Sequence, residues 1–166
     1  MMKQIYAADV VAMETLGAAL AGVLRDRGAV VYLRGELGAG KTTLVRGVAR
    51  GLGVGGRVRS PTYTLVEGYE LPDGMLYHLD LYRLSGAEEL EFLGIRELEA
   101  PANRVFIEWP ERVAEDALPA ADLVLSLETQ GEGRAISVLP VSAHGERLAS
   151  GWQSRLAEGQ DAEARS

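Results

Sequence analysis

The sequence predicts an α/β fold, in which helices cover both faces of a mostly parallel central sheet. Three observations support this class. Two short apolar runs, Ala29–Gly35 and Arg104–Trp109, are typical of strands that are buried on both faces, as strands of parallel sheets are. Around these runs, apolar residues recur at the spacing of amphipathic helices. A Pro-Asp-Gly turn within Leu71–Gly74 adds an antiparallel hairpin to the sheet.

Two helices are expected in the first third of the chain. One covers residues 10–26, and the other follows the glycine-rich loop that comes after Ala29–Gly35. The glycines of Gly51–Gly56 end the second helix. Their apolar stripes are Leu16, Leu20, Val23 and Leu24 in the first helix, and Leu44, Val45, Val48 and Leu52 in the second.

The middle of the chain predicts the hairpin and a short helix. Residues 64–70 and 75–81 flank the Pro-Asp-Gly turn and are expected to pair as antiparallel strands. Ser85 followed by Glu88 has the spacing of a capping box, so a short helix is expected to begin there.

The last third predicts two more strands and a terminal helix. Ala121–Thr129 and Gly133–Val141 read as a late pair of strands. We expect a single domain over residues 1–157, followed by a polar, unstructured tail over residues 158–166. The terminal helix is indicated by Leu148, Trp152 and Leu156.

Composition narrows the function classes. The chain has no cysteine, which excludes disulfides, thiolate metal sites and a cysteine nucleophile. Its 17 basic and 24 acidic residues give a net charge of −7, which argues against a stand-alone nucleic-acid binder. No apolar stretch reaches the length of about 18 residues that a membrane span needs. We therefore expect a cytoplasmic protein with no membrane and no DNA partner.

The segment Gly35–Thr42, GELGAGKT, fits the pattern G-x-x-x-x-G-K-[ST] of a phosphate-binding loop. A predicted strand precedes it and a predicted helix follows, which is the context that the motif requires. Glycines let backbone N–H groups point inward, and the helix N-terminus adds its positive dipole end. The fold class thus becomes a P-loop NTPase-like three-layer sandwich. The nucleotide-binding residues expected from the loop are Gly35, Glu36, Leu37, Gly38, Ala39, Gly40, Lys41, Thr42 and Thr43.

The motif and two acidic residues predict a magnesium-dependent site for ATP. Lys41 is expected to reach the β- and γ-phosphates, Thr42 to bind Mg²⁺, and Thr43 to contact the α-phosphate. Glu108 ends the more apolar of two strands and is favoured with Thr42 as a metal ligand. Asp80 ends the other strand and becomes the candidate to orient the attacking water or support the metal's outer coordination. The predicted catalytic residues are therefore Lys41, Asp80 and Glu108.

The motifs of this sequence resemble those of the TsaE (YjeE) family, small bacterial ATPases needed to make threonylcarbamoyladenosine in tRNA. The order and spacing of the motifs fit the family from about residue 10 to residue 140, without departure inside the motifs. The matching stretches are GELGAGKTTLVRG (Gly35–Gly47), SPTYTLVEGY (Ser60–Tyr69), HLDLYRL (His78–Leu84) and EWPE (Glu108–Glu111).

The resemblance implies an ATPase that works with the TsaD and TsaB proteins and meets tRNA only through that complex. It implies that Trp109 lies beside the nucleotide and that Ser60–Thr64 is a switch-like loop near the γ-phosphate, with Thr62 as its nucleotide contact. We hypothesise that partner docking orders Arg59–Leu65 over the γ-phosphate. The resemblance assigns Lys41, Thr42, Thr43, Asp80 and Glu108 to the nucleotide and metal site.

Three residues keep two interpretations each. His78 alternates with Asp80 along a strand, so their side chains face the same way, and either a hydrogen-bonded pair or a packed neutral histidine fits. Thr15 and Leu16 lie near the start of the first helix. The resemblance suggests that they lie by the adenine, and an ordinary helix face explains them equally well.

Other classes of protein use the same loop. A GTPase is excluded by the lack of a guanine-reading N-K-x-D segment. A small-molecule P-loop kinase needs an arginine-rich lid and an acceptor site, for which the chain leaves little room. An ATP-binding docking module without significant hydrolysis remains open, because binding and hydrolysis use the same residues.

Overall fold

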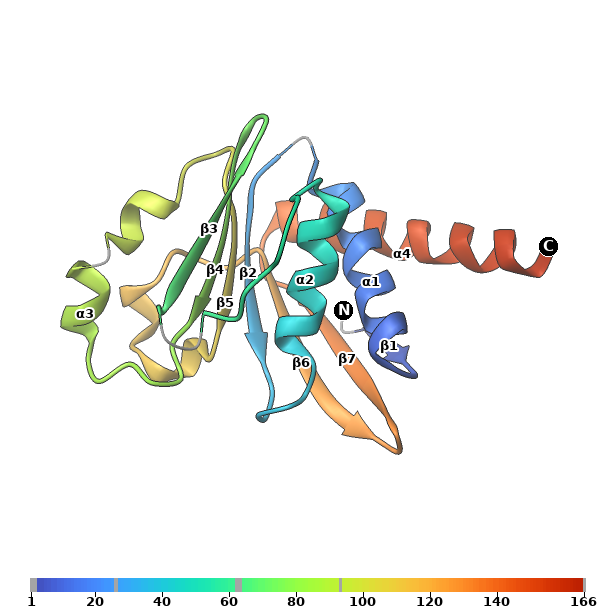
Figure 1. Ribbon diagram of the computed structural model, residues 1–166, viewed down its shortest axis with the longest axis horizontal. Helices are drawn as coiled ribbons and strands as arrows, with labels where there is room; N and C mark the ends of the chain where they lie inside the picture. Colours follow the sequence, from blue (N-terminus) through green and yellow to red (C-terminus); the bar gives the residue numbers. More distant parts are fainter. Residues whose placement is uncertain (1–2, 26, 62–63, 93, 166) are drawn as a thin grey trace.

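A single mixed sheet forms the centre of the computed structural model, which describes residues 3–25, 27–61, 64–92 and 94–165 (Figure 1). Helices pack on both faces of this sheet. The strands are β1 (Lys3–Ala7), β2 (Ala29–Arg34), β3 (Val66–Leu71), β4 (Gly74–Asp80), β5 (Arg104–Glu108), β6 (Leu123–Gln130) and β7 (Gly133–Pro140). The helices are α1 (Val10–Val23), α2 (Lys41–Gly51), α3 (Ala87–Phe92) and α4 (Ala143–Arg165), with short 3-10 turns η1 (Ile95–Leu98), η2 (Pro110–Arg112) and η3 (Glu115–Ala117).

The seven strands lie in the order β1-β7-β6-β2-β5-β4-β3. Strands β6, β2, β5 and β4 pair in parallel at the centre of the sheet. Antiparallel pairing adds β3 to β4 at one edge, and β7 and then β1 to β6 at the other. Five strands therefore run in one direction and two, β3 and β7, in the other. The predicted α/β class, the mostly parallel sheet and the antiparallel hairpin are confirmed.

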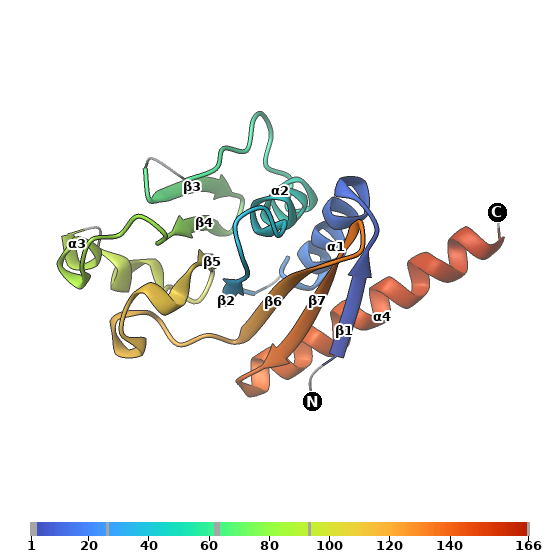
Figure 2. The same ribbon diagram turned by 90° about the horizontal axis from the view of Figure 1, so that it is seen from below.

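Each face of the sheet carries its own apolar layer. Figure 2 shows α1 and α2 on one side of the sheet and α3 on the other. Helices α1, α2 and α4 cover one face, where Leu20, Leu44 and Trp152 are buried against strand side chains such as Val31 and Phe106. The other face is covered by α3 and the turns around it, where Leu90, Ile95, Leu98 and Leu118 pack on Val30, Tyr32, Leu79, Val105 and Ile107. Alternate residues of one strand enter opposite layers, as the two-residue period of a strand requires.

One strand was missed and two local predictions need correction. Strand β1 was not predicted, because its residues, KQIYA, are mostly polar or exposed and lack the apolar run of a buried strand. Helix α4 extends to Arg165 and so includes residues 158–165 that we expected as a tail; Ala, Glu, Gln and Arg favour helix. The hydroxyl of Ser85 donates to the Glu89 carboxylate rather than forming the expected capping box with Glu88.

Arg104 is a buried charge at the start of β5, with only 1% of its surface exposed. Its guanidinium donates to both carboxylate oxygens of Asp73 at 2.9 Å, in the turn between β3 and β4. It also donates to the carbonyl oxygens of Leu24, Arg25 and Ala102. The side chain therefore ties the hairpin turn to the end of α1 at the edge of the sheet opposite the glycine-rich loop.

Candidate functional site

The glycine-rich loop joins the end of β2 to the first turn of α2. Gly38 and Gly40 have φ values of 80° and 104°, a region that favours glycine, and Gly40 is the residue before the helix. A Cβ on Gly35 would lie 2.5 Å from the carbonyl oxygen of Leu127 in β6. Larger residues at these positions would strain the loop, which explains why the sequence places glycine there. The loop leaves the N-terminus of α2 facing the cavity described next.

Parallel pairing brings three strand ends to one edge of the sheet. In the register, Leu33 of β2 and Asp80 of β4 both lie opposite Glu108 of β5. Ligands bind beyond the carboxyl ends of strands in open α/β sheets. A cavity of about 230 Å³ lies there, lined by Leu37, Gly38, Ala39, Gly40, Lys41, Thr42, Thr43, Ser60, Asp80, Glu108 and Trp109.

Lys41 is the buried cation of this cavity. Its ammonium donates to the carbonyl oxygens of Gly35 and Glu36, and it lies 4.5 Å from the centroid of the Trp109 ring. Burial lowers the pKa of Lys41, and the negative charges of Glu108 and Asp80 oppose that shift. The loop therefore holds a largely desolvated positive group among oxygen atoms, where a phosphate would meet it.

Glu108 is a buried carboxylate with two side-chain partners. The hydroxyl of Thr42 donates to Glu108 Oε2 at 3.1 Å, and Nε2 of His78 lies 2.5 Å from the same oxygen. The register places His78 opposite Phe106, so the histidine reaches Glu108 diagonally across β4 and β5. The sequence left open a hydrogen-bonded pair of His78 with Asp80. In the structure, His78 pairs with Glu108 instead.

Asp80 lies beside Glu108 at the same sheet edge. Its Oδ1 accepts a hydrogen bond from the backbone N–H of Tyr82 at 3.1 Å. Burial raises the pKa of Asp80, this hydrogen bond lowers it, and the negative charge of Glu108 raises it further. A carboxylate whose charged form is disfavoured accepts a proton more readily than an exposed one, which suits a group that orients water.

The donors at this edge fit a magnesium ion. The Thr42 hydroxyl and the Glu108 carboxylate are oxygen ligands, the type that Mg²⁺ prefers, and they already lie within 3.1 Å of each other. Within the described part of the chain, no three acidic, histidine or cysteine side chains gather into a metal site of their own. An ion here would thus depend on phosphate and water oxygens, as Mg²⁺ usually does.

Trp109 covers the cavity from a strained position. Its backbone has a φ of 59°, unusual for a bulky residue, and its N–H donates to the carbonyl oxygen of Leu33 at 3.2 Å. The ring contacts that of Tyr82, with 4.9 Å between the centroids. The ring lies over the ammonium of Lys41, and the place of Trp109 beside a nucleotide stays a prediction.

The predicted switch-like segment is described only in part, and Thr62 lies outside the described residues. Ser60 lines the phosphate cavity. The carbonyl oxygen of Leu65 accepts the N–H of Asp80 at 3.0 Å, and Leu65 itself has a φ of 66°. The far end of the segment is thereby attached to the strand end that carries Asp80.

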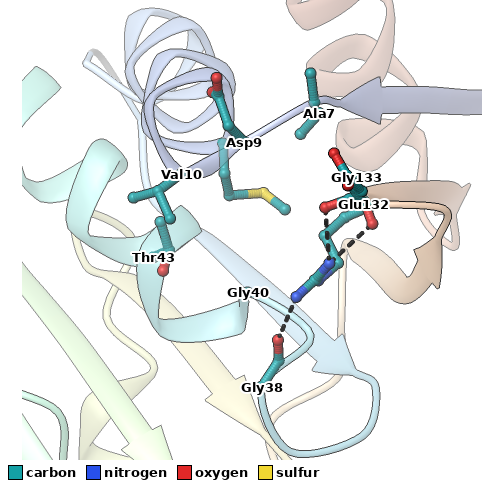
Figure 3. A pocket seen from close by; sticks show the side chains of 11 residues that line it. Ala7, Asp9, Val10, Gly38, Gly40, Thr43, Glu132 and Gly133 are labelled. Carbon is teal, nitrogen blue, oxygen red and sulfur yellow. Dashed lines mark hydrogen bonds between the residues drawn. The ribbon is translucent and has the colours of Figure 1, made fainter.

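A second cavity, of about 400 Å³, adjoins the loop and was not predicted from the sequence. Figure 3 shows Val10, at the start of α1, beside Thr43 of α2, with Glu132 and Gly133 of the β6–β7 turn across the cavity. Arg134 donates to the carbonyl oxygen of Gly38 at 3.2 Å and so attaches that turn to the loop. The second cavity is lined by Ala7, Ala8, Asp9, Val10, Met13, Gly38, Gly40, Thr43, Glu132, Gly133 and Arg134.

The residues expected near the adenine lie outside this second cavity. The hydroxyl of Thr15 donates back to the carbonyl oxygen of Val11, and Leu16 is part of the apolar core. The residues of α1 that line the cavity come from its first turn instead. The β6–β7 turn lines the cavity too. The two strands were predicted as a late pair, but the sequence pattern gave no signal that their turn lies against the start of α1.

Comparison with known proteins gives consistent matches. The family model described as "Threonylcarbamoyl adenosine biosynthesis protein TsaE" matches residues 7–136. A protein of Haemophilus influenzae named tRNA threonylcarbamoyladenosine biosynthesis protein TsaE is 40% identical over 153 residues, covering 90% of this chain and 96% of that protein. Its namesake in Bacillus subtilis is 37% identical over 134 residues, covering 79% of this chain and 82% of its own length.

A solved structure has the same architecture. The crystal structure of Bacillus subtilis YdiB superposes with a TM-score of 0.74 and 25% sequence identity, and the match covers 93% of this chain and 95% of that one. The similarity thus extends over the whole sheet and its helices rather than over the glycine-rich loop alone.

Proposed function

From the finding that the chain belongs to the TsaE family, which serves tRNA threonylcarbamoyladenosine biosynthesis, we propose that it is a P-loop ATPase. It binds and hydrolyses Mg-ATP to support threonylcarbamoyl transfer to adenosine in tRNA. The observation that carries this proposal is the meeting of Lys41, Thr42, Asp80 and Glu108 around one cavity at the carboxyl edge of the sheet.

The two cavities together suit one ATP molecule. The loop residues Gly38, Gly40 and Thr43 line both cavities, so a ligand can pass over the loop from one cavity to the other. The β- and γ-phosphates would lie by Lys41, where the N-terminus of α2 adds N–H donors. The ribose and base would then occupy the cavity beside Asp9 and the β6–β7 turn.

The chemistry assigned to the residues follows from their positions. Lys41 binds the phosphates, and Thr42 and Glu108 hold Mg²⁺, which supplies charge neutralisation for the phosphate oxygens. Asp80 accepts a hydrogen bond from the water that attacks the γ-phosphorus, and ADP leaves from the other side. Trp109 excludes bulk water from one wall of the site.

The partners and the compartment belong to the same proposal. We assign TsaD and TsaB as protein partners and the cytoplasm as the compartment. Among the described residues, no helix combines the length and apolar character that crossing a bilayer requires. Residues 59–65 precede β3 and reach the cavity through Ser60, which supports the hypothesis that docking of a partner orders this segment beside the γ-phosphate.

The test is phosphate release from Mg-ATP by the protein alone and with its TsaB and TsaD counterparts. We expect slow release by the protein alone and faster release in the complex. By linkage, partners and ATP should raise each other's affinity by the same factor. Transfer of phosphate to a small molecule would instead identify a kinase. ATP binding without release under any condition would identify a docking module.

A further inference from the structure

Four arginines converge on a cleft of about 630 Å³ outside the ATP site. Two come from α2, and the other two come from the segment after it, which turns back and runs beside the helix in Figure 1. We call this surface the arginine cleft. It is lined by Arg46, Arg50, Arg57, Val58, Arg59 and Ser60.

The positive charge of the cleft is only partly neutralised. Arg46 and Arg50 share one carboxylate, that of Glu14, at 3.4 and 2.8 Å. Arg57 and Arg59 are exposed, and within the described residues no carboxylate forms an ion pair with either of them. The Glu14 carboxylate thus compensates only part of the positive charge of four guanidinium groups, in a chain whose net charge is −7. A local charge of the opposite sign to the whole molecule indicates an anionic ligand.

We propose that the arginine cleft binds phosphate groups of an RNA backbone, the RNA being the tRNA that the family's pathway modifies. This direct contact revises the expectation, drawn from the net charge of −7 and from the family resemblance, that the chain meets tRNA only through its protein partners. Guanidinium forks match phosphate oxygens in pairs, which suits arginine for such contacts. Among the described residues, the lining holds no aromatic ring and no amide side chain, so arginine supplies nearly all of its hydrogen-bond donors. The contact is therefore to the backbone and independent of sequence. The tRNA assignment rests on the family's role, and the cleft does not depend on ATP hydrolysis.

The lining also argues against an acidic protein segment as the ligand. Protein interfaces usually have an apolar, desolvated centre surrounded by a polar rim. Among the described residues that line the cleft, Val58 is the one apolar side chain, and it is half-buried. Phosphate contacts need no apolar centre, so this composition favours RNA.

The cleft adjoins the proposed ATP site. Ser60 lines both the arginine cleft and the phosphate cavity. Arg46 lies on α2, the helix whose first residues are Lys41 and Thr42. RNA bound in the cleft would consequently lie next to the segment that borders the γ-phosphate position, where it can stabilise one arrangement of that segment.

The experiment measures RNA binding by fluorescence anisotropy, with a labelled, unmodified tRNA transcript at about 50 mM salt. The test variant is Arg57→Gln/Arg59→Gln, which changes two exposed side chains. The matched control is Arg147→Gln/Arg155→Gln, which makes the same charge change on exposed residues of α4. Binding of the test variant should weaken by about tenfold or more, while the control stays close to wild type.

The salt dependence gives a second readout. Each lost phosphate contact lowers the slope of log K against log salt by about 0.7 for single strands, so the test variant should lose about 1.4. Arg57→Lys/Arg59→Lys should restore the slope, because it restores the charge. A labelled polyglutamate peptide serves as the alternative anion, and we expect it to bind more weakly than RNA.

Three outcomes would overturn the assignment. These are wild-type protein that does not bind the transcript, equal weakening in test and control variants, and polyglutamate that binds more tightly than RNA through Arg57 and Arg59. Mg-ATP affinity is measured in parallel without RNA. Arg57 lies outside residues 59–65, so Arg57→Gln alone should weaken RNA binding and keep the wild-type Mg-ATP affinity. Loss of ATP binding by this single variant would show a structural defect and count against the cleft. Intact RNA binding without any ATP hydrolysis would overturn the proposed ATPase and leave the cleft standing.

Discussion

At the scale of single residues, the site depends on charges that the fold removes from water. Lys41 is only 5% exposed, and Glu108 only 3%. Each has partners that compensate for burial: loop carbonyls and a tryptophan ring for the lysine, and Thr42 and His78 for the glutamate. A buried charge interacts more strongly than an exposed one because less water screens it. Substitutions here should therefore act on ligand binding more than on the surrounding fold.

Lys41→Ala should abolish useful ATP turnover. The change removes a charge-assisted hydrogen bond to the phosphates, which commonly contributes about 1.5–3 kcal/mol. Lys41→Arg should not rescue the activity, because a planar fork does not fit a site shaped for a point charge. Phosphate release and ATP titration measure both effects. An active Lys41→Arg protein would show that the phosphates bind elsewhere.

Glu108→Ala should weaken the dependence of ATP binding on Mg²⁺. The substitution removes the carboxylate that lies within 3.1 Å of the Thr42 hydroxyl. We expect tighter ATP binding on adding Mg²⁺ in the wild type and much less gain in the variant, as titrations with and without the ion will measure. Glu128→Ala changes an exposed carboxylate of β6 and is the matched control. If ATP binding by Glu108→Ala responds to Mg²⁺ as the wild type does, residues other than Glu108 hold the metal.

At the scale of elements, the position of α2 depends on its close contact with α1. A Cβ on Gly47 would lie 2.2 Å from the carbonyl oxygen of Glu14, and one on Gly17 would lie 2.3 Å from that of Leu44. The two helices approach closely only because each presents a glycine at the contact. The first turn of α2 carries Lys41, so helix packing sets the position of the phosphate-binding groups.

Gly47→Ala should push α2 away from α1 and destabilise the protein by about 1–3 kcal/mol, the usual effect of overpacking. ATP affinity should fall too, because the helix N-terminus shifts. Urea denaturation and ATP titration report the two effects. Gly159→Ala, on an exposed part of α4 with nothing within 4 Å, is the control and should be neutral or slightly stabilising. A Gly47→Ala protein as stable as wild type would contradict the close contact.

At the scale of the whole molecule, the edge of the sheet opposite the ATP site is held by one buried cation. Arg104 joins the β3–β4 turn, the end of α1 and the start of β5. The hydrogen bonds from Arg104, with its positive charge, hold the pKa of Asp73 below its usual range. A carboxyl whose pKa is lower in the folded than in the unfolded state stabilises the protein at pH values above its unfolded-state pKa. This contribution is lost as the pH falls through the folded-state pKa.

Asp73→Asn should therefore reduce stability at neutral pH and have a smaller effect in acid. The difference in free energy of unfolding between variant and wild type should begin to shrink below about pH 4, where the carboxyl of the unfolded chain takes up a proton, and should fall further as the pH drops through the lower folded-state pKa. Urea denaturation at pH 7 and pH 3 measures it. Asp116→Asn, which removes an exposed carboxylate, should show no comparable pH dependence. A constant difference at both pH values would show that the charge of Asp73 does not act through Arg104.

The sequence by itself determined the elements that depend on neighbouring residues. Apolar runs, helical spacing and Pro-Asp-Gly identified β2, α2, β5 and the hairpin within one or two residues of their observed ends. The glycine-rich loop was recognisable because its pattern and its strand–helix context are both local. These signals reflect backbone preferences over a few residues, which is why they can be read without a structure.

Only the tertiary structure decided which distant residues meet. His78 and Glu108 are 30 positions apart, and the parallel register of β4 and β5 brings them to 2.5 Å. The second cavity needs the β6–β7 turn to lie against the start of α1, and the arginine cleft needs the segment around Arg57 to turn back along α2. Strand order and register follow from how all the elements share one core, and no local pattern encodes that arrangement.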